Sequence, residues 1–160
     1  MATSNEDFLD AMLRHQIGLM RLSGSIRNDV FALLDATEAD LVEQIERLTR
    51  TGGLTPANAR RIARLELIVK GIRGGAWKDV NKLWHTEMNA LALAQPQFVA
   101  NAIRTVLPVQ INLAIPAPEL LRAVVTSVPF EGKTLRGWAA TQANADISRI
   151  MDQVRIGMVQ

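Results

Sequence analysis

Few residues of this 160-residue chain could carry chemistry, since it has two histidines and no cysteine. His15 and His85 stand far apart, and neither has a metal-binding spacing such as His-x-x-x-His or His-Glu-x-x-His. A catalytic histidine needs a nucleophile or a substrate proton within reach, and no such arrangement is visible in the sequence. We therefore interpret both histidines as surface or interface residues. The lack of cysteine excludes a disulfide scaffold, thiol catalysis and a zinc–thiolate site.

The segment Gly132-Lys133-Thr134 is similar to the end of a phosphate-binding loop. That loop needs another glycine five residues before Gly132, where this chain has Ser127, and it follows a strand, whereas the preceding residues predict a helix. We interpret the segment as a turn followed by a helix cap. Paired carboxylates, a nucleophile elbow and a glycine-rich dinucleotide loop are also missing from the sequence. We expect a non-enzymatic protein without catalytic, cofactor-binding or metal-binding residues.

The net charge of +2 hides an uneven distribution of charge along the chain. Residues 1–50 carry 5 basic and 9 acidic side chains, whereas residues 51–75 carry 5 basic and 1 acidic. The basic residues of this second block are Arg60, Arg61, Arg64, Lys70 and Arg73. The three nearest the start of the block share one side of a predicted helix, where they could contact DNA phosphates or an acidic protein surface. The same pattern is common on a solvated helix face, and no aromatic residue is interleaved for base stacking.

The elements that position these residues are predicted to be helices. With 48% apolar residues and no tyrosine, the chain has the composition of a folded protein with an aliphatic core. We expect an elongated, all-α assembly that forms one structural unit. Its regions are an N-terminal helical hairpin (1–53), central helices (54–106), and a segment with an extended strap, a short helix and a long helix (107–160). The larger aromatic residues are expected in the core: Trp77, Trp84, Phe98, Phe130 and Trp138. No apolar run is long enough to span a membrane, and the N-terminus does not resemble a secretion signal.

The predicted hairpin is divided by Ser23-Gly24-Ser25, which indicates a break between two helices. The first helix has an apolar face formed by Leu9, Leu13, Ile17 and Met20. The second helix has an apolar stripe that includes Leu34, Leu41 and Leu48. Either the hairpin packs on its own domain or the stripe meets a partner helix, so these three leucines are candidate interface residues.

Glycine and proline predict the limits of the central helices. Thr55-Pro56 indicates a helix start, and Gly71 with Gly74-Gly75 indicates its end. A second central helix is expected from Trp77 to about Ala94, and Pro96 predicts a break or kink before a short helix over 97–106.

Residues 107–118 do not have a helical pattern. Three prolines bracket a run in which apolar residues alternate with others; the apolar members are Val109, Ile111, Leu113 and Ile115. We favour an extended strap packed over helices, with strand pairing to another chain as the alternative, and these four residues are candidate interface residues.

After this segment, Pro118 predicts a short helix to about Ser127, Pro129–Gly132 a turn, and Thr134 the cap of a last helix. The apolar period still runs at Met158-Val159, so we expect either further chain or an end that docks on another subunit.

Three stretches of the second half of the chain together resemble a known family. They are Glu87–Gln95 followed by Phe98, Leu107–Pro116, and Val128-Pro-Phe-Glu-Gly-Lys-Thr-Leu-Arg-Gly-Trp138 continuing to Asp146–Gly157. This pattern is similar to the phage minor head, or head-morphogenesis, proteins of the Mu F-like family. Such proteins often have Pro-Phe-x-Gly-x-x-Leu-x-x-Trp, and then a long helix with an Ile-Arg-x-Gly-like step. The resemblance covers about residues 84–160, and residues 1–83 share only a general helical similarity.

The resemblance implies a virion component made in the host cytoplasm and located inside the head or at the portal vertex. It implies a few copies that bind the portal protein, each other or other head proteins, and that serve head assembly or genome delivery. In the family more chain usually follows the long helix, and the matching residues are turn, cap and core positions, so no catalytic residue is carried over. The alternative is a nucleic-acid-binding module in which the basic cluster Arg60–Arg73 contacts packaged DNA.

Overall fold

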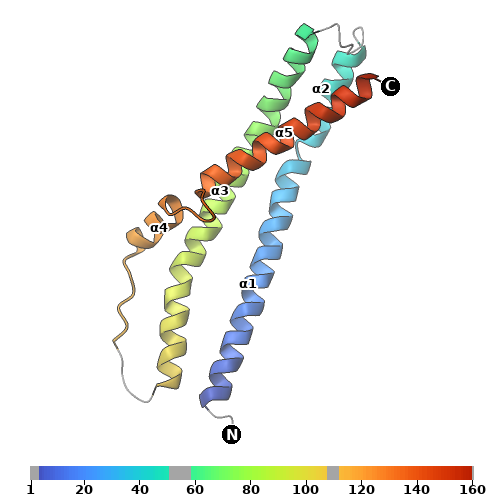
Figure 1. Ribbon diagram of the computed structural model, residues 1–160. Coiled ribbons are helices and arrows are strands. Elements are labelled where there is room, and N and C mark those ends of the chain that lie inside the picture. Colours follow the sequence, from blue (N-terminus) through green and yellow to red (C-terminus); the bar gives the residue numbers. More distant parts are fainter. Residues whose placement is uncertain (1–3, 51–58, 108–111, 160) are drawn as a thin grey trace. The chain divides into compact units, whose positions relative to one another are not determined.

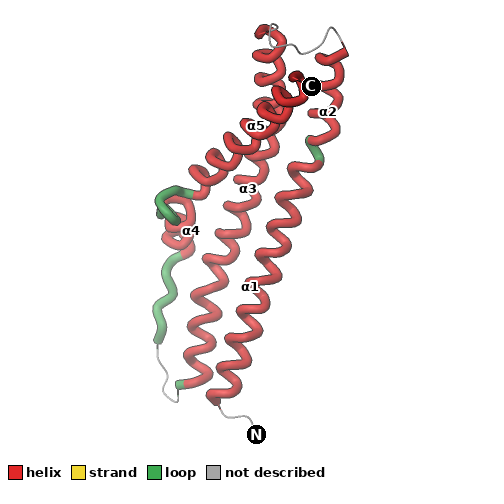
Figure 2. The backbone as a smooth tube through the Cα atoms, turned by 45° about the vertical axis from the view of Figure 1, so that its right-hand side comes forward, coloured by secondary structure: helices red, strands yellow, loops and turns green. Residues whose placement is uncertain are grey.

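The computed structural model describes residues 4–50, 59–107 and 112–159, which form five helices (Figures 1 and 2). The helices are α1 (Ser4–Asp35), α2 (Glu38–Arg50), α3 (Ala59–Val106), α4 (Pro118–Ser127) and α5 (Leu135–Val159). Among the described residues the only β-type pairing is an isolated bridge between Phe130 and Lys133. The predicted all-α fold class is confirmed.

The chain divides into two compact units, and the division differs from the three consecutive regions expected from the sequence. Unit 1 consists of Met1–Asn28 and Leu83–Thr134, and unit 2 of Asp29–Lys82 and Leu135–Gln160. The predicted boundaries near residues 53 and 106 therefore do not separate the units. The reason is that α1 and α3 are long enough for each to contribute one part to each unit.

The predicted break at residues 23–25 is wrong, because α1 is continuous from Ser4 to Asp35. A glycine inside a helix costs only about 1 kcal/mol relative to alanine, and the half-buried Leu22 and Ile26 hold the helix on either side of Gly24. The interruption lies instead at residues 36–37, where the Thr37 hydroxyl donates a hydrogen bond to the Leu34 carbonyl at 2.8 Å. In both views α2 continues onward from the end of α1, so the expected hairpin does not form (Figures 1 and 2).

The helix end predicted at the glycines is also wrong, because Gly71 and Gly74-Gly75 lie inside the single 48-residue helix α3. Pro96, where a break or kink is expected, lies inside the same helix, so no break separates residues 97–106 from it. Buried residues on both sides of the glycines, Val69 and Val80 among them, keep this stretch helical through tertiary packing. The predicted start of this helix at Thr55-Pro56 lies outside the described residues.

The core of unit 2 is aliphatic and comes from three helices. Its buried members are Leu41 and Leu48 of α2, Leu65 and Val69 of α3, and Met151 of α5. Half-buried residues pack around them: Ile45, Ile62, Ile68, Ile72, Ile147, Ile150 and Val154.

In unit 1 the inward face of α1 is not the predicted one. The predicted face of Leu9, Leu13, Ile17 and Met20 is exposed, and a neighbouring face is half-buried instead, with Phe8, Met12, Leu19 and Leu22. The exposed set recurs at spacings of three and four, and the half-buried set at spacings of four, seven and three, so either could have faced the neighbouring helix. Four of the aromatic residues expected in the core are half-buried, but Phe130 is exposed.

The segment after α3 agrees with the sequence prediction where it is described. Residues 112–117 are extended and lie beside α3 (Figure 2), as expected for a strap, and α4 has the predicted bounds. A tight turn follows, in which the backbone N–H of Phe130 donates to the carbonyl of Lys133 at 2.8 Å, and that of Lys133 donates back at 3.2 Å. Its two central residues, Glu131 and Gly132, have φ of 48° and 82°. Such positive values at both positions are typical of a type I′ turn.

We predict that Leu65→Ala lowers the free energy of unfolding by about 2–5 kcal/mol, because it leaves a cavity in the core of unit 2. Leu67→Ala provides the control, since Leu67 lies two residues away on the exposed side of α3. Chemical denaturation monitored by circular dichroism measures the free energy of unfolding of both variants. Equal losses in the two variants would contradict the assignment of the buried face.

The turn gives a second prediction. Glu131 is a non-glycine residue with positive φ, so Glu131→Asn should raise the free energy of unfolding by about 0.5 kcal/mol, because asparagine tolerates this conformation better. Gly132→Ala should lower it by about 1 kcal/mol through backbone strain alone, because a Cβ at Gly132 would meet nothing within 4 Å. Thermal unfolding measures the change in stability of each variant relative to the wild-type chain. Changes of the same sign in the two variants would contradict a turn of this type.

Candidate interaction surfaces

Unit 2 contains a buried carboxylate with several polar partners, that of Asp146 on α5, whose side chain is 7% exposed. It accepts a hydrogen bond from Trp77 Nε1 of α3 at 3.2 Å, and its other oxygen lies 2.9 Å from Arg149 Nη2. Arg73 Nε of α3 lies 3.4 Å from Asp146 Oδ2, and the Arg73 side chain is 12% exposed. A buried charge needs such partners, since an unpaired one is very costly in a low-dielectric interior.

The same arginine reaches the junction between α1 and α2. Arg73 Nη1 donates hydrogen bonds to the Leu34 carbonyl at 2.6 Å and to the Thr37 hydroxyl at 2.9 Å. The Leu34 carbonyl lies in the last turn of α1, where carbonyls lack helical partners. One side chain therefore joins α3, α5 and the end of α1 within unit 2. Asp146 was not singled out from the sequence, although it shares a helix face with the apolar Ala139, Ala143 and Ile150.

The predicted basic cluster is not brought together as one surface. Arg60 and Arg64 are exposed and Arg61 is half-buried. Lys70 Nζ lies 2.7 Å from Glu66 Oε1, and this hydrogen bond and charge hold the pKa of Glu66 below its usual value. Arg73 points into unit 2, which corrects its assignment to a phosphate-contacting face. The physical reason is that α3 does not end at the glycines, so Arg73 keeps the helical phase of the inward residues.

The candidate interface leucines of the second predicted helix are also internal. Leu41 and Leu48 are buried in the core of unit 2, and Leu34 is half-buried beside Arg73. These leucines pack against other residues of the same chain, which corrects their assignment as an interface with a partner.

In unit 1 the histidine of α1 contacts α3. The rings of His15 and Phe98 are stacked with centroids 3.7 Å apart and an interplanar angle of 11°. His15 Nε2 also lies 2.8 Å from Gln95 Oε1, within hydrogen-bond distance. His85, the other histidine, is half-buried on α3 in the same unit. His15 therefore takes part in helix packing, with no nucleophile among these partners.

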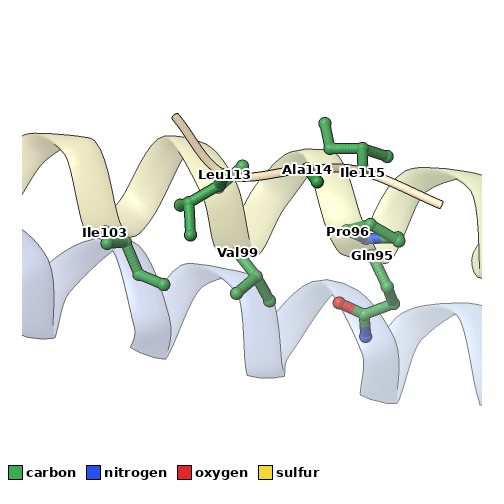
Figure 3. A pocket seen from close by; sticks show the side chains of 8 residues that line it. Gln95, Pro96, Val99, Ile103, Leu113, Ala114 and Ile115 are labelled. Carbon is green, nitrogen blue, oxygen red and sulfur yellow. The ribbon is translucent and has the colours of Figure 1, made fainter. Parts of the chain in front are cut away.

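An apolar groove of about 350 Å³ lies between the strap and α3. Its lining comes from Gln95, Pro96, Val99, Ala100 and Ile103 of α3 and from Leu113, Ala114 and Ile115 of the strap. Figure 3 shows Leu113 on the side of Val99 and Ile103, and Ile115 on the side of Pro96. Of the candidate strap residues, Leu113 and Ile115 are thus half-buried against the chain's own helix, and Val109 and Ile111 lie outside the described residues.

A more exposed apolar surface lies on α4 and the turn after it. We call it the α4 face, and it consists of Leu120, Val124, Val128 and Phe130, which are 58%, 47%, 55% and 68% exposed. No residue of α4 is buried. The spacing of four between its first two members indicates a shared helix side, but does not show whether that side is covered.

The described part of the chain contains no group of three or more histidine, aspartate and glutamate side chains that could hold a metal ion. None of its helices combines the length and the apolar character needed to cross a membrane. Comparisons of the chain with protein families, with curated proteins and with solved structures give no match.

We predict that Asp146→Ala lowers the free energy of unfolding by about 3 kcal/mol or more, because Arg73 is then left as a buried charge without its carboxylate. Asp152→Ala is a matched control, since Asp152 is exposed and pairs with Arg155 three residues later, as Asp146 does with Arg149. It should change stability by less than about 1 kcal/mol. Urea denaturation measures the free energy of unfolding of both variants. A similarly small decrease in the two would contradict the structural role of Arg73 and Asp146.

Proposed function

We propose that this chain is a non-enzymatic structural protein of a phage virion, a minor head protein that binds the portal vertex during head assembly or genome delivery. The observation that carries the proposal is the α4 face. It belongs to unit 1, within the stretch that resembles the head-morphogenesis proteins, and three of its four members are more than half exposed.

The residues of the resembling pattern are consistent with a scaffold for this face. Phe130, Glu131, Gly132 and Lys133 form the tight turn between α4 and α5. The turn holds Val128 and Phe130 next to the end of α4. Exposed apolar groups of this kind are more common at protein contacts than on isolated surfaces.

The alternative, contact with packaged DNA, is supported by Arg60 and Arg64, which are exposed near the start of α3. It is weakened by the pairing of Lys70 with Glu66 and by the inward position of Arg73. Two exposed arginines neutralise few phosphates, and the salt dependence of binding scales with that number.

The proposal predicts that the chain co-purifies with the portal protein of its own phage as a complex of defined mass. Leu120→Ser combined with Phe130→Ser should reduce the affinity for the portal by at least tenfold, because both substitutions remove exposed apolar contact area. Light scattering after size exclusion measures the mass, and biolayer interferometry the affinity.

Two variants provide the controls. Leu67→Ser removes a leucine of unit 2 that is more exposed than Leu120, and Arg60→Glu with Arg64→Glu reverses the charge of the exposed arginines; both should leave portal binding unchanged. The proposal would be overturned in favour of the alternative by a wild-type chain that does not bind the portal but binds duplex DNA at low salt in an electrophoretic mobility-shift assay. In that case the two arginine substitutions should abolish DNA binding.

A further inference from the structure

The first part of α1 has apolar residues on two sides, and only one of them is used within unit 1. The inward side, which includes His15, meets α3. The other side has an exposed stripe, which we call the α1 stripe: Leu9, Leu13, Ile17 and Met20, exposed by 60%, 54%, 49% and 74%. A surface helix of a globular protein normally has one apolar side. The α1 stripe therefore has the character of a face that packs against a further helix.

The α1 stripe continues to Gly24, which shares its helical phase. From Leu9 to Gly24 the stripe is about 22 Å long at 1.5 Å per residue. A Cβ added at Gly24 would meet nothing within 4 Å, so the surface here is flat and open. A large side chain of a neighbouring helix could approach the backbone closely at this point.

The charges beside the α1 stripe are complementary to those of a second α1 helix in antiparallel orientation. Glu6 and Asp10 lie at its N-terminal end, and Arg21 and Arg27 lie at its C-terminal end. By helical phase, Asp10 and Arg21 border the same edge of the stripe. In an antiparallel pair of helices like edges meet, so each acidic end would face a basic end. In a parallel pair, acids would face acids and arginines would face arginines.

We propose that the α1 stripe is the contact surface for a second copy of this chain, with the two α1 helices antiparallel about a two-fold axis near Ile17. In this register Leu13 packs against Met20 of the second copy, and Leu9 packs over Gly24, where the backbone is open. Glu6 faces Arg27 of the second copy. Asp10, which already pairs with Arg14 at 2.6 Å, lies within reach of Arg21 of the second copy. The inference does not rest on the portal proposal, since it uses a different face of unit 1.

The oligomeric state is the first test. Sedimentation velocity over a concentration series should show a dimer for the full chain, and Leu13→Lys with Ile17→Lys should give a monomer with unchanged helicity by circular dichroism. Leu120→Lys with Val124→Lys is the matched control, because it places the same charges on the exposed α4 face and should leave the dimer intact. A wild-type chain that stays monomeric at about 100 µM would overturn the inference.

The charges allow a test that a general loss of stability could not mimic. Glu6→Lys with Asp10→Lys should weaken self-association at least tenfold, and so should Arg21→Glu with Arg27→Glu in a separate chain. When the two variants are mixed, both ends of α1 are basic in one chain and acidic in the other, so opposite charges meet at each end of the pair. A heterodimer should therefore form with about wild-type affinity. Failure of the mixture to associate more tightly than either variant alone would contradict the pairing.

Cysteine substitutions test the direction of the helices without background, since the chain has no cysteine. Under mild oxidation, a mixture of Leu13→Cys and Met20→Cys chains should form a disulfide-linked heterodimer, whereas neither variant should cross-link with itself. Cross-linking of the Leu13→Cys chain with itself would indicate a parallel pair and overturn the proposed arrangement.

Discussion

The guanidinium of Arg73 and the carboxylate of Asp146 are charged groups inside an aliphatic interior, and each needs the other nearby. This requirement aligns α5 on α3 within unit 2. If α5 slid by one turn, apolar residues would still face inward, but Arg73 would lose Asp146 and Trp77 would lose its acceptor. The same guanidinium bonds to the Leu34 carbonyl and so holds the α1–α2 junction against α3. The positions of Leu41 and Met151 in the core depend on this alignment.

Local signals in the sequence were sufficient where one segment decides its own structure. The helical fold class, the bounds of α4 and the turn that follows it agree with periodicity, proline and glycine. Neither glycine nor proline ended a helix at Gly24, Gly74 or Pro96. There the local cost of about 1–3 kcal/mol per residue is smaller than the gain from packing a long uninterrupted helix on both sides of the site.

The candidate surfaces were less predictable than the fold, because exposure is decided by which elements meet in space. Leu41 and Leu9 have equivalent patterns in the sequence, yet one is buried against α3 and α5 and the other is exposed. Arg73 was grouped with Arg60 and Arg64 by charge alone, and only the course of α3 separates an inward arginine from its exposed neighbours. The α4 face depends on a helix that buries none of its own residues, and a short window of sequence contains no sign of that.

The interleaving of the two units has a consequence for the order in which they can fold during synthesis. Every segment of unit 1 has been translated once Thr134 is made, whereas unit 2 still lacks α5, which is the next segment of the chain. Yet α2 and the first part of α3 are made before most of unit 1. Leu65 and Val69 must therefore wait for Met151 as their apolar neighbour. During that interval the nascent chain presents an unfinished aliphatic surface of the kind that chaperones bind. For the same reason neither unit corresponds to a continuous piece of the gene.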